Sequence, residues 1–328
     1  MPTRGTLPRW RRVPTTSARH CRHSPSPSSL FPSALRAATL ATVLSTVACD
    51  DGGEGVAECK PVDARAAIEH AGAIDGEESW GEGLHIVTDT IVVGSGASLI
   101  IEGCAVVRMA ADTSIVVDDE AVGFVADGSA ERPIVIERAD AGAAWRSVNA
   151  FGPATLRLQH TTIPGGGTSQ ARDDAEFAGT SVAVRVFGND DVDLLFVDTV
   201  VIEDSTGVGV LLQGAGFIDV AVDPRTRIEQ AVIRFAGGES TTTGVCPAAQ
   251  GASSGDADGA VIVFTAEAPS SAFITNTAIE HSAGCGIYRG WSVDGVDFTD
   301  TNTFSDLGGC AQSNVSDANS GCDTGPCL

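Results

Sequence analysis

An internal repeat constrains the fold of this chain more than any other feature of its sequence. Residues 196–210 align with residues 273–287 at an offset of 77, and a Phe, an Ile-Glu pair, a Ser and two Gly coincide. Weaker copies place an apolar residue at the equivalent position elsewhere. The resulting anchor residues are Ile163, Ile202, Ile233, Ile279 and Phe304. Self-similarity of this kind is typical of solenoids, in which each repeat packs only on its neighbours.

The spacing of the anchors indicates which solenoid this is. The gaps are 39, 31, 46 and 25 residues, and the shortest is typical of one coil of a parallel β-solenoid. Gly-rich insertions at 165–179 and 237–259 are predicted to be loops outside the coils. We therefore expect an all-β, right-handed parallel β-helix, with strands stacked about 4.8 Å apart. A β-sandwich or jelly roll is the alternative, because Asp127-Gly128 and Asp294-Gly295 resemble hairpin turns.

Short runs rich in Val, Ile and Thr, bounded by Gly, Asp, Asn or Ser, predict the strands. They cover residues 85–93, 98–109, 113–117, 121–126, 133–137, 154–159, 182–187, 194–202, 208–212, 218–222, 231–235, 260–265, 272–279 and 293–298. A helix is expected at 61–71, where Pro61 suits a first helical turn.

The N-terminal region has the layout of an export signal. Residues 1–48 contain seven Arg and no acidic residue, and an apolar stretch at 37–48 ends at Cys49. The break at Cys49 resembles the lipobox of bacterial lipoproteins, although Thr46 stands where that family prefers Leu. The resemblance implies acylation of Cys49 and a lipid anchor in the membrane; ordinary signal cleavage is the alternative. The apolar stretch is roughly half of what a bilayer span needs.

These boundaries suggest five parts of the chain. We expect a signal peptide with an N-terminal extension (1–48), an acidic Gly-rich tether (49–58), a capping segment (59–80), the β-helix (81–312) and a Cys-containing tail (313–328). The part after residue 48 has 13 basic and 43 acidic residues, a formal charge of −30. This charge repels nucleic acid, so nucleic acid is not expected as a partner.

Cysteine usage fits an exported, disulfide-bonded protein. Cys285 and Cys310 each lie six residues after an anchor, so stacked anchors would bring them within the Cα range of a disulfide, about 4.4–6.8 Å. Cys59 and Cys104 would tie the capping segment to the first coils, and Cys322 with Cys327 would close a terminal loop. Cys246 is then left over, and it is the alternative partner for Cys285 or Cys310. No Cys/His spacing is typical of zinc.

Several segments resemble bacterial surface β-helix proteins of the pectate-lyase-like superfamily. Residues 91–107 are similar to their opening coil, 125–136 to the next conserved segment, and 142–146, with Trp145, to the Gly-x-Trp that follows. Residues 276–288 are similar to an Asn-x-x-Ile pattern of that superfamily. The resemblance covers about residues 80–310 and implies the β-helix fold and a place at the cell surface, but it does not imply an activity.

The catalytic patterns of this superfamily are poorly matched. Polygalacturonase-like enzymes use paired carboxylates, together with Gly-His-Gly and Arg-x-Lys patterns that this sequence lacks. Its acidic pairs stand in other contexts, and no acid cluster accompanies the lyase-type bases. The acidic pairs are Asp118-Asp119, Asp173-Asp174 and Asp190-Asp191, and the candidate bases are Arg157, Arg185, Arg234 and Arg289.

The remaining candidates favour surface roles. Asp190, Asp191 and Asp193 are weak calcium candidates, with a solvated acidic turn as the alternative. Glu203 and Glu280 occupy equivalent repeat positions and predict an outward-facing row. Trp145 and Trp291 are expected to cover coil edges or cap the core, with carbohydrate stacking as the alternative.

The sequence therefore predicts a lipid-anchored β-helix protein of the cell envelope, at the outer membrane or cell surface. We expect a non-enzymatic binding or structural module without a cofactor, whose ligand is unknown; a glycan or another envelope component is a candidate. A polysaccharide lyase or glycoside hydrolase acting on acidic polysaccharide is the alternative.

Overall fold

A computed structural model describes residues 58–152, 154–167, 180–186, 195–214, 226–234, 236, 259–264, 272–282, 285–289, 297–307 and 311–314. All of them belong to one compact unit, which spans Gly55–Leu328. This part of the chain contains almost no helix, and no helix in it has the length and apolar character of a membrane span.

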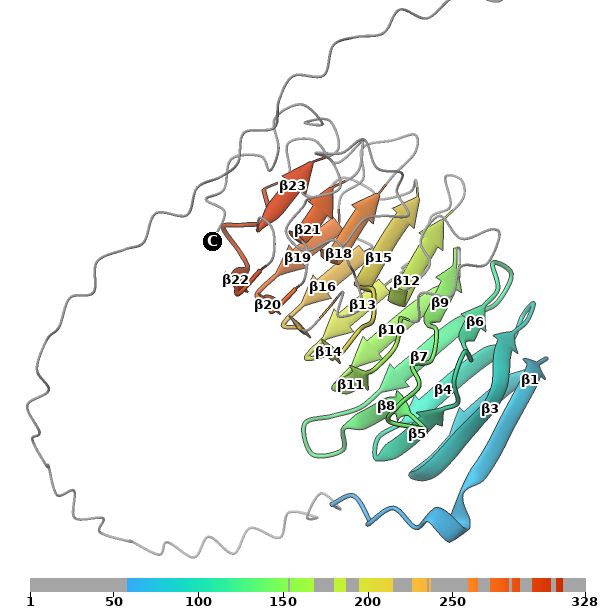
Figure 1. Cartoon of the computed structure of the whole chain (residues 1–328). Helices are drawn as coiled ribbons and strands as arrows, with labels where there is room; N and C mark the ends of the chain where they lie inside the picture. Colours follow the sequence, from blue (N-terminus) through green and yellow to red (C-terminus); the bar gives the residue numbers. More distant parts are fainter. Residues whose placement is uncertain are drawn as a thin grey trace, which may run out of the picture. The chain divides into compact units, whose positions relative to one another are not determined.

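The strands form long parallel ladders (Figure 1). Ladder 1 comprises part of β3 (Gly83–Val93), β5 (Ala105–Met109), β8 (Ile134–Arg138), β11 (Thr161–Pro164), β14 (Val201–Glu203), β17 (Val232–Arg234), β20 (Ala278–Glu280) and β22 (Thr303–Ser305). Ladder 2 comprises the rest of β3, β6 (Ile115–Val117), β9 (Val148–Phe151), β12 (Thr180–Val186), β15 (Val208–Gly214), β18 (Gly259–Phe264), β21 (Cys285–Arg289) and β23 (Gln312–Asn314). Ladder 3 comprises β2 (Glu77–Trp80), β4 (Ser98–Glu102), β7 (Gly123–Asp127), β10 (Thr155–Gln159), β13 (Leu195–Asp198), β16 (Thr226–Glu229) and β19 (Ala272–Thr275).

The chain visits the ladders in rotation, as in β7, β8 and β9. Ladders 1 and 2 join through β3 and, with β1 (Ile68–Ile74) paired to β3, make a 16-stranded sheet; ladder 3 is a separate 7-stranded sheet. This all-β arrangement of long parallel sheets is consistent with a β-helix or solenoid. Asp127-Gly128 does not form a hairpin turn, because β7 and β8 lie in different sheets, and Asp294-Gly295 lies outside the described residues.

The anchor residues stack as the repeat predicts. Ile163 lies opposite Ile202, which lies opposite Ile233. Ile279 and Phe304 continue the same row. The four isoleucines are at most 1% exposed and belong to a hydrophobic core that runs along the ladders. Burial of each Ile side chain contributes about 1.5–3 kcal/mol, so the anchors stabilise the stacking of neighbouring strands.

Three of the longer predicted strands are each two strands in the structure, separated by a corner at which the chain passes from one ladder to the next. The runs predicted at 98–109, 194–202 and 272–279 are β4 with β5, β13 with β14, and β19 with β20. A residue with positive φ stands at each corner: Cys104 (72°), Thr199 (51°) and Asn276 (51°). A residue in the left-handed conformation bends the chain sharply at the corner, so the two halves of one apolar run enter different ladders.

The helix predicted at 61–71 is wrong. Only Ala64–Ala66 forms a 3-10 turn, and β1 begins at Ile68. An isolated helix of this length is marginal in water, whereas β1 pairs with the edge of β3.

Other sequence-based boundaries shift or cannot be compared. The strand predicted at 218–222 and most of that at 293–298 lie outside the described residues, as do 168–179 and 237–258 of the two predicted loops. Gly259, assigned to the second loop, is the first residue of β18. Runs too short or too polar to be predicted as strands include β2, β9, β16 and β23.

Candidate functional site

A row of charged side chains follows the outer face of ladder 1. Arg108 lies opposite Glu137, and Pro164 lies opposite Glu203. Arg234 and Glu280 continue the row, which confirms that Glu203 and Glu280 occupy equivalent positions. Residues in one row stand a strand spacing apart, so opposite charges can pair between neighbouring coils.

Two ion pairs form within this row. The Arg108 Nε lies 2.9 Å from Glu137 Oε1, and the Arg234 Nη2 lies 2.6 Å from Glu203 Oε2. Pro164 carries no charge, and it stands between the two pairs. The row therefore has an uncharged gap at β11, flanked by ion pairs on both sides.

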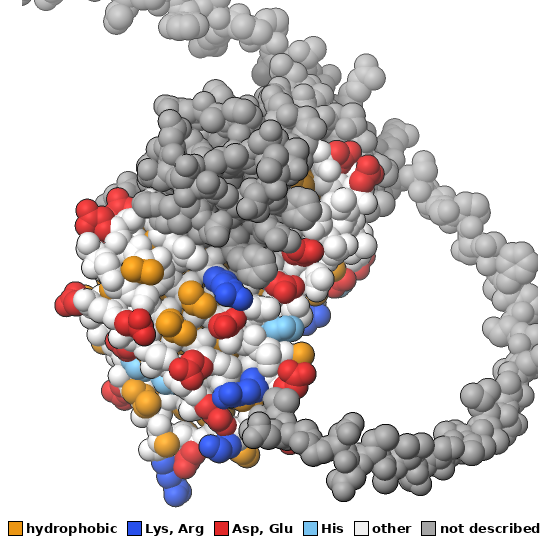
Figure 2. Space-filling model, turned by 180° about the vertical axis from the view of Figure 1, so that it is seen from behind, with side chains coloured by type: hydrophobic (Ala, Val, Ile, Leu, Met, Phe, Trp, Pro, Cys, Tyr) orange, Lys and Arg blue, Asp and Glu red, His pale blue; other side chains and the backbone are white. Residues whose placement is uncertain are grey.

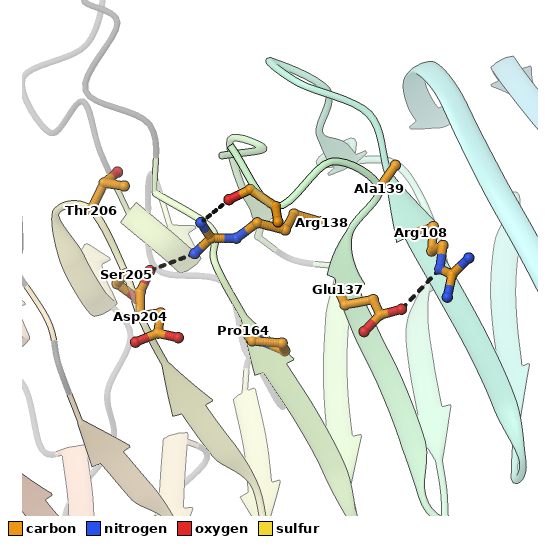
Figure 3. Close-up of a pocket in the computed structure, with 9 residues that line it drawn as sticks. Arg108, Glu137, Arg138, Ala139, Pro164, Asp204, Ser205 and Thr206 are labelled. Carbon is orange, nitrogen blue, oxygen red and sulfur yellow. Dashed lines mark hydrogen bonds and ion pairs between the residues drawn. The ribbon is translucent and has the colours of Figure 1, made fainter. Parts of the chain in front are cut away.

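A pocket of about 820 Å³ opens over this gap (Figure 3). Arg138 extends from the end of β8 across the pocket, toward the chain that follows β14. Its guanidinium donates to the carbonyl of Ala141 at 3.2 Å and to the carbonyl of Asp204 at 3.4 Å. The lining includes Arg108, Glu137, Arg138, Pro164, Asp204 and Thr206. The pocket thus carries two guanidinium groups, two carboxylates and the apolar ring of a proline.

Arg138 differs from most other arginines of the described part. Arginines 108, 132, 146, 157 and 234 each lie within 4.0 Å of a carboxylate. Arg138 contacts backbone carbonyls instead, so its charge is not neutralised by an acidic side chain of the described residues. A guanidinium held in this way presents donors to an anionic or hydroxyl-rich ligand.

Two residues outside the pocket lining, Gly165 and Trp145, lie next to Arg138 and Pro164 respectively. Gly165 has a φ of 75°, and a Cβ at this position would collide with the Arg138 guanidinium. Trp145 is fully buried in the core and donates its indole N–H to the Pro164 carbonyl at 3.2 Å. The predicted role of Trp145 in covering the core is consistent with this burial. Glycine is favoured at 165 by its left-handed backbone, and it leaves the space that the Arg138 guanidinium occupies.

A second cluster lies at the N-terminal end of the ladders and joins His70, Glu78, Trp80 and His85. The His70 ring stacks on Trp80 with centroids 4.1 Å apart, and its Nε2 lies 2.9 Å from the Nδ1 of His85. The Nδ1 of His70 lies 3.3 Å from Glu78 Oε1, which also accepts the indole N–H of Trp80 at 2.6 Å. Burial is the main cause that lowers the pKa of His70 from 6.5; His85 lowers it further and Glu78 opposes the shift.

The Cys59–Cys104 disulfide predicted from the sequence is present, with Cα atoms 5.3 Å apart. It joins the segment before β1 to the corner between β4 and β5. The Lys60 N–H donates to Glu82 Oε1 at 2.7 Å, and Arg132 reaches the same carboxylate at 3.7 Å. The start of the compact unit is therefore fastened at two places, by the disulfide and by the histidine cluster.

Most other candidate residues lie outside the described residues. These are Cys49, Asp190, Asp191, Asp193, Cys246, Trp291, Cys310, Cys322 and Cys327. Cys285 begins β21, whose register aligns Ile287 with Gln312. The described part of the chain holds no group of three or more His, Cys, Asp or Glu suited to a metal ion.

The candidate bases do not converge on one site. Arg157 is on ladder 3, where it lies 3.5 Å from Asp127, and Arg234 is paired with Glu203 on ladder 1. Arg185 and Arg289 belong to β12 and β21 of ladder 2. Over the face shown in Figure 2, acidic side chains are spread among neutral, apolar and basic ones, without a single acidic cluster among the described residues.

Sequence reasoning missed the residues that line the pocket. Arg108, Glu137 and Arg138 stand in short strands of unremarkable composition, and only the register between coils brings them beside Asp204. His70 and His85 were also missed, because the helix predicted at 61–71 concealed the pairing of β1 with β3. Comparison with protein-family models, curated proteins and solved structures found no match for this chain.

Proposed function

We propose that this chain is an exported bacterial lipoprotein of the cell envelope that binds a glycan without turning it over. Its body is a right-handed parallel β-helix of the pectate-lyase-like kind, held to the outer membrane or cell surface through an acylated Cys49. The rotation of the strands through three parallel ladders and the stacked anchors support this fold. The basic and apolar layout of residues 1–48 supports export.

The pocket over β11 is the proposed ligand site. The proline ring of Pro164 offers an apolar surface for the C–H face of a sugar ring, and the Arg108–Glu137 ion pair and Asp204 offer donors and acceptors for its hydroxyl groups. Arg138 adds a guanidinium that no acidic side chain of the described part neutralises. Pockets that combine apolar surface with a few fixed polar groups are typical ligand sites.

The proposal that the protein binds a ligand without catalysis is based on the ion pairs between carboxylates and arginines at the site. Glycoside hydrolysis requires two carboxyl groups, one as acid and one as base or nucleophile. Glu137 is bound by Arg108 at 2.9 Å, and Glu203 is bound by Arg234 at 2.6 Å. These ion pairs hold both carboxylates in place, each already bound by an arginine. Glu203 lies outside the pocket lining, whose two carboxylates are Glu137, held by Arg108, and Asp204.

A glycan array with the purified full chain tests this proposal, followed by incubation of each bound glycan and analysis of its products. We expect binding of envelope-type glycans without cleavage. Arg138→Ala should reduce binding at least tenfold, a loss of about 1.4 kcal/mol. Arg157→Ala is the matched control, because Arg157 is an exposed, ion-paired arginine on ladder 3 and should leave binding unchanged.

Three results would count against the proposal. Shortened or unsaturated products would favour a polysaccharide lyase or glycoside hydrolase. Equal losses for the Arg138 and Arg157 variants would show that binding depends on general charge and not on the pocket. An array without any bound glycan would refute the glycan as ligand.

A further inference from the structure

The two sulfur atoms of the Cys59–Cys104 disulfide stand in unequal surroundings. Cys59 is exposed on the segment before β1, whereas Cys104 is 5% exposed at the corner between β4 and β5. In thiol–disulfide exchange a thiolate attacks one sulfur atom and the other leaves as a thiolate, so access to each sulfur matters. The attack on Cys59 comes from the side away from Cys104, which is the side of the solvent. An attack on Cys104 would have to come from the protein interior.

Arg132 lies where it stabilises negative charge on the sulfur of Cys104. Its Nε–H donates to the Cys104 Sγ at 3.4 Å, and its Nη2 donates to the Gly103 carbonyl at 3.1 Å. The Glu82 carboxylate attracts the same guanidinium, but from 3.7 Å and at Nη2, so the Nε–H remains directed at the sulfur. A guanidinium beside a cysteine favours its thiolate form. When the disulfide breaks, Cys104 is therefore the favoured leaving group.

The sulfur of Cys59 faces a group of the opposite kind. The carbonyl oxygen of Glu131 lies 3.9 Å from the Cys59 Sγ. This oxygen carries lone pairs and only accepts hydrogen bonds, so it disfavours a thiolate on Cys59. The two local environments and the difference in exposure therefore favour the same direction of exchange, with attack at Cys59 and departure of Cys104.

Both cysteines have backbone contacts nearby that do not pass through the disulfide. The Cys104 N–H donates to the Pro133 carbonyl at 3.0 Å, and β4 and β5 pair with β7 and β8 on either side of the corner. Next to Cys59, the Lys60 N–H donates to Glu82 Oε1 at 2.7 Å. After exchange, the Cys104 thiolate therefore stays close to Cys59 and can attack it to restore the original bond.

We propose that Cys59–Cys104 is an exchangeable disulfide and that Cys59 is a site of reversible covalent attachment for a small external thiol. The incoming thiolate forms a disulfide bond with the Cys59 Sγ, and the bond to Cys104 breaks. The electron pair of that bond goes to the Cys104 Sγ, which remains as a thiolate beside Arg132. One disulfide replaces another, so the step needs no oxidant, and attack by Cys104 expels the thiol again. This site does not depend on the glycan proposal.

Peptide mapping of the full chain tests the attachment site, with reduced glutathione as the thiol. The protein is incubated with excess glutathione at about pH 7.5, quenched with acid, and labelled with a maleimide at its free thiols before digestion without reductant. We expect the glutathionyl group on Cys59 at about ten times its level on Cys104 or more, and the maleimide on Cys104. Removal of glutathione before the quench should restore the original disulfide.

Two matched variants test the role of the guanidinium. Arg132→Gln removes its charge but keeps an amide donor near Cys104, and it should slow the formation of the Cys59 adduct by about threefold or more. Arg157→Gln removes the same charge from an exposed, ion-paired arginine on ladder 3, and the adduct should form at the wild-type rate.

The wild-type map decides the attachment site even if Arg132→Gln fails to fold. Comparable adducts on Cys59 and Cys104 would overturn the proposal, because exchange would then take place in chains that have opened around the disulfide. A disulfide that excess glutathione leaves intact would overturn it as well. An Arg132→Gln variant that exchanges as fast as the wild type would refute the stabilisation of the Cys104 thiolate by the guanidinium.

Discussion

Asn302 offers a sharp test of how the last coils are held together. The residue is 9% exposed, and its Nδ2 donates to the carbonyls of Ile274 at 2.9 Å and Phe298 at 2.8 Å. Its Oδ1 accepts the N–H of Thr277 at 3.0 Å. Carbonyls only accept and the backbone N–H only donates, so the orientation of this amide is determined by its partners. One side chain therefore joins the corner before β20 to the corner before β22.

Asn302→Asp keeps the shape of the side chain and the acceptor for Thr277 but removes both donors. The Phe298 carbonyl loses this donor and the Ile274 carbonyl keeps only the Thr301 hydroxyl at 3.2 Å, and both then face a carboxylate, at about 1–3 kcal/mol each. The stronger bond to the Thr277 N–H offsets part of this loss, and we expect a net destabilisation of about 3 kcal/mol. Burial and the facing carbonyls raise the pKa of the introduced carboxyl above its unfolded value of about 3.9, so the loss grows as pH rises from there.

Amide exchange in β20 and β22 measures this loss locally, because the last strands of a parallel ladder can open without the rest. A loss of about 3 kcal/mol corresponds to a protection factor lowered by roughly 150-fold at pH 7.5, and the effect should be smaller at pH 5. Asn276→Asp is the matched control, since Asn276 is an exposed corner residue whose left-handed φ Asp also tolerates. Equal effects of the two variants, or a loss that does not depend on pH, would refute the role assigned to the Asn302 amide.

Four further predictions follow from the sequence and the fold. Cys49→Ser should move the protein from the membrane fraction to the soluble fraction and abolish acyl labelling; a variant that keeps both would refute lipidation. Gly165→Ala should lower stability by about 1–2 kcal/mol in thermal unfolding, because its left-handed backbone disfavours a Cβ, whereas Gly76→Ala, with open space around the added carbon, should have little effect. Deletion of residues 240–243 should leave the melting temperature within a few degrees, because a change in loop length costs little entropy; aggregation of the variant would show that the segment is a structural coil. Non-reducing peptide mapping should link Cys285 to Cys310, and a Cys246 peptide linked to either residue would contradict the stacking of these cysteines.

The stack of anchors was predictable because its cause is periodic. Because Ile202 packs against Ile233 of the neighbouring strand, each strand of ladder 1 needs an apolar residue at this position, whatever the length of the loops between strands. This requirement is visible in the sequence as the aligned Ile-Glu pairs. Because the following residue of each pair points outward, the same repeat also predicted that Glu203 and Glu280 share a row.

Corners were not predictable to the same degree, because very different residues can make them. His160, Thr199, Gln230 and Asn276 all stand with positive φ between ladder 3 and ladder 1. Glycine and asparagine are the residues that signal such a conformation, and threonine and glutamine rarely do. Here the backbone bonds between neighbouring coils continue through the corners, as in the bond from the His160 N–H to the Asp198 carbonyl. Stacking in this way supports a conformation that the residue itself disfavours.

The candidate site was hidden from the sequence because no coil contains it. Arg108 and Glu137 come from successive coils, Pro164 from the next, and Asp204 from the one after. Each of these residues stands alone in a short strand, where an outward Arg or Glu is an ordinary surface residue. The site differs from the rest of ladder 1 in two ways. Pro164 stands where the neighbouring strands carry a charged residue, and Arg138 donates to the backbone carbonyls of Ala141 and Asp204. Where neighbouring strands of a parallel ladder pair their outward charges, a ligand site is best sought where that pairing is interrupted, and the Arg138→Ala variant tests this inference at β11.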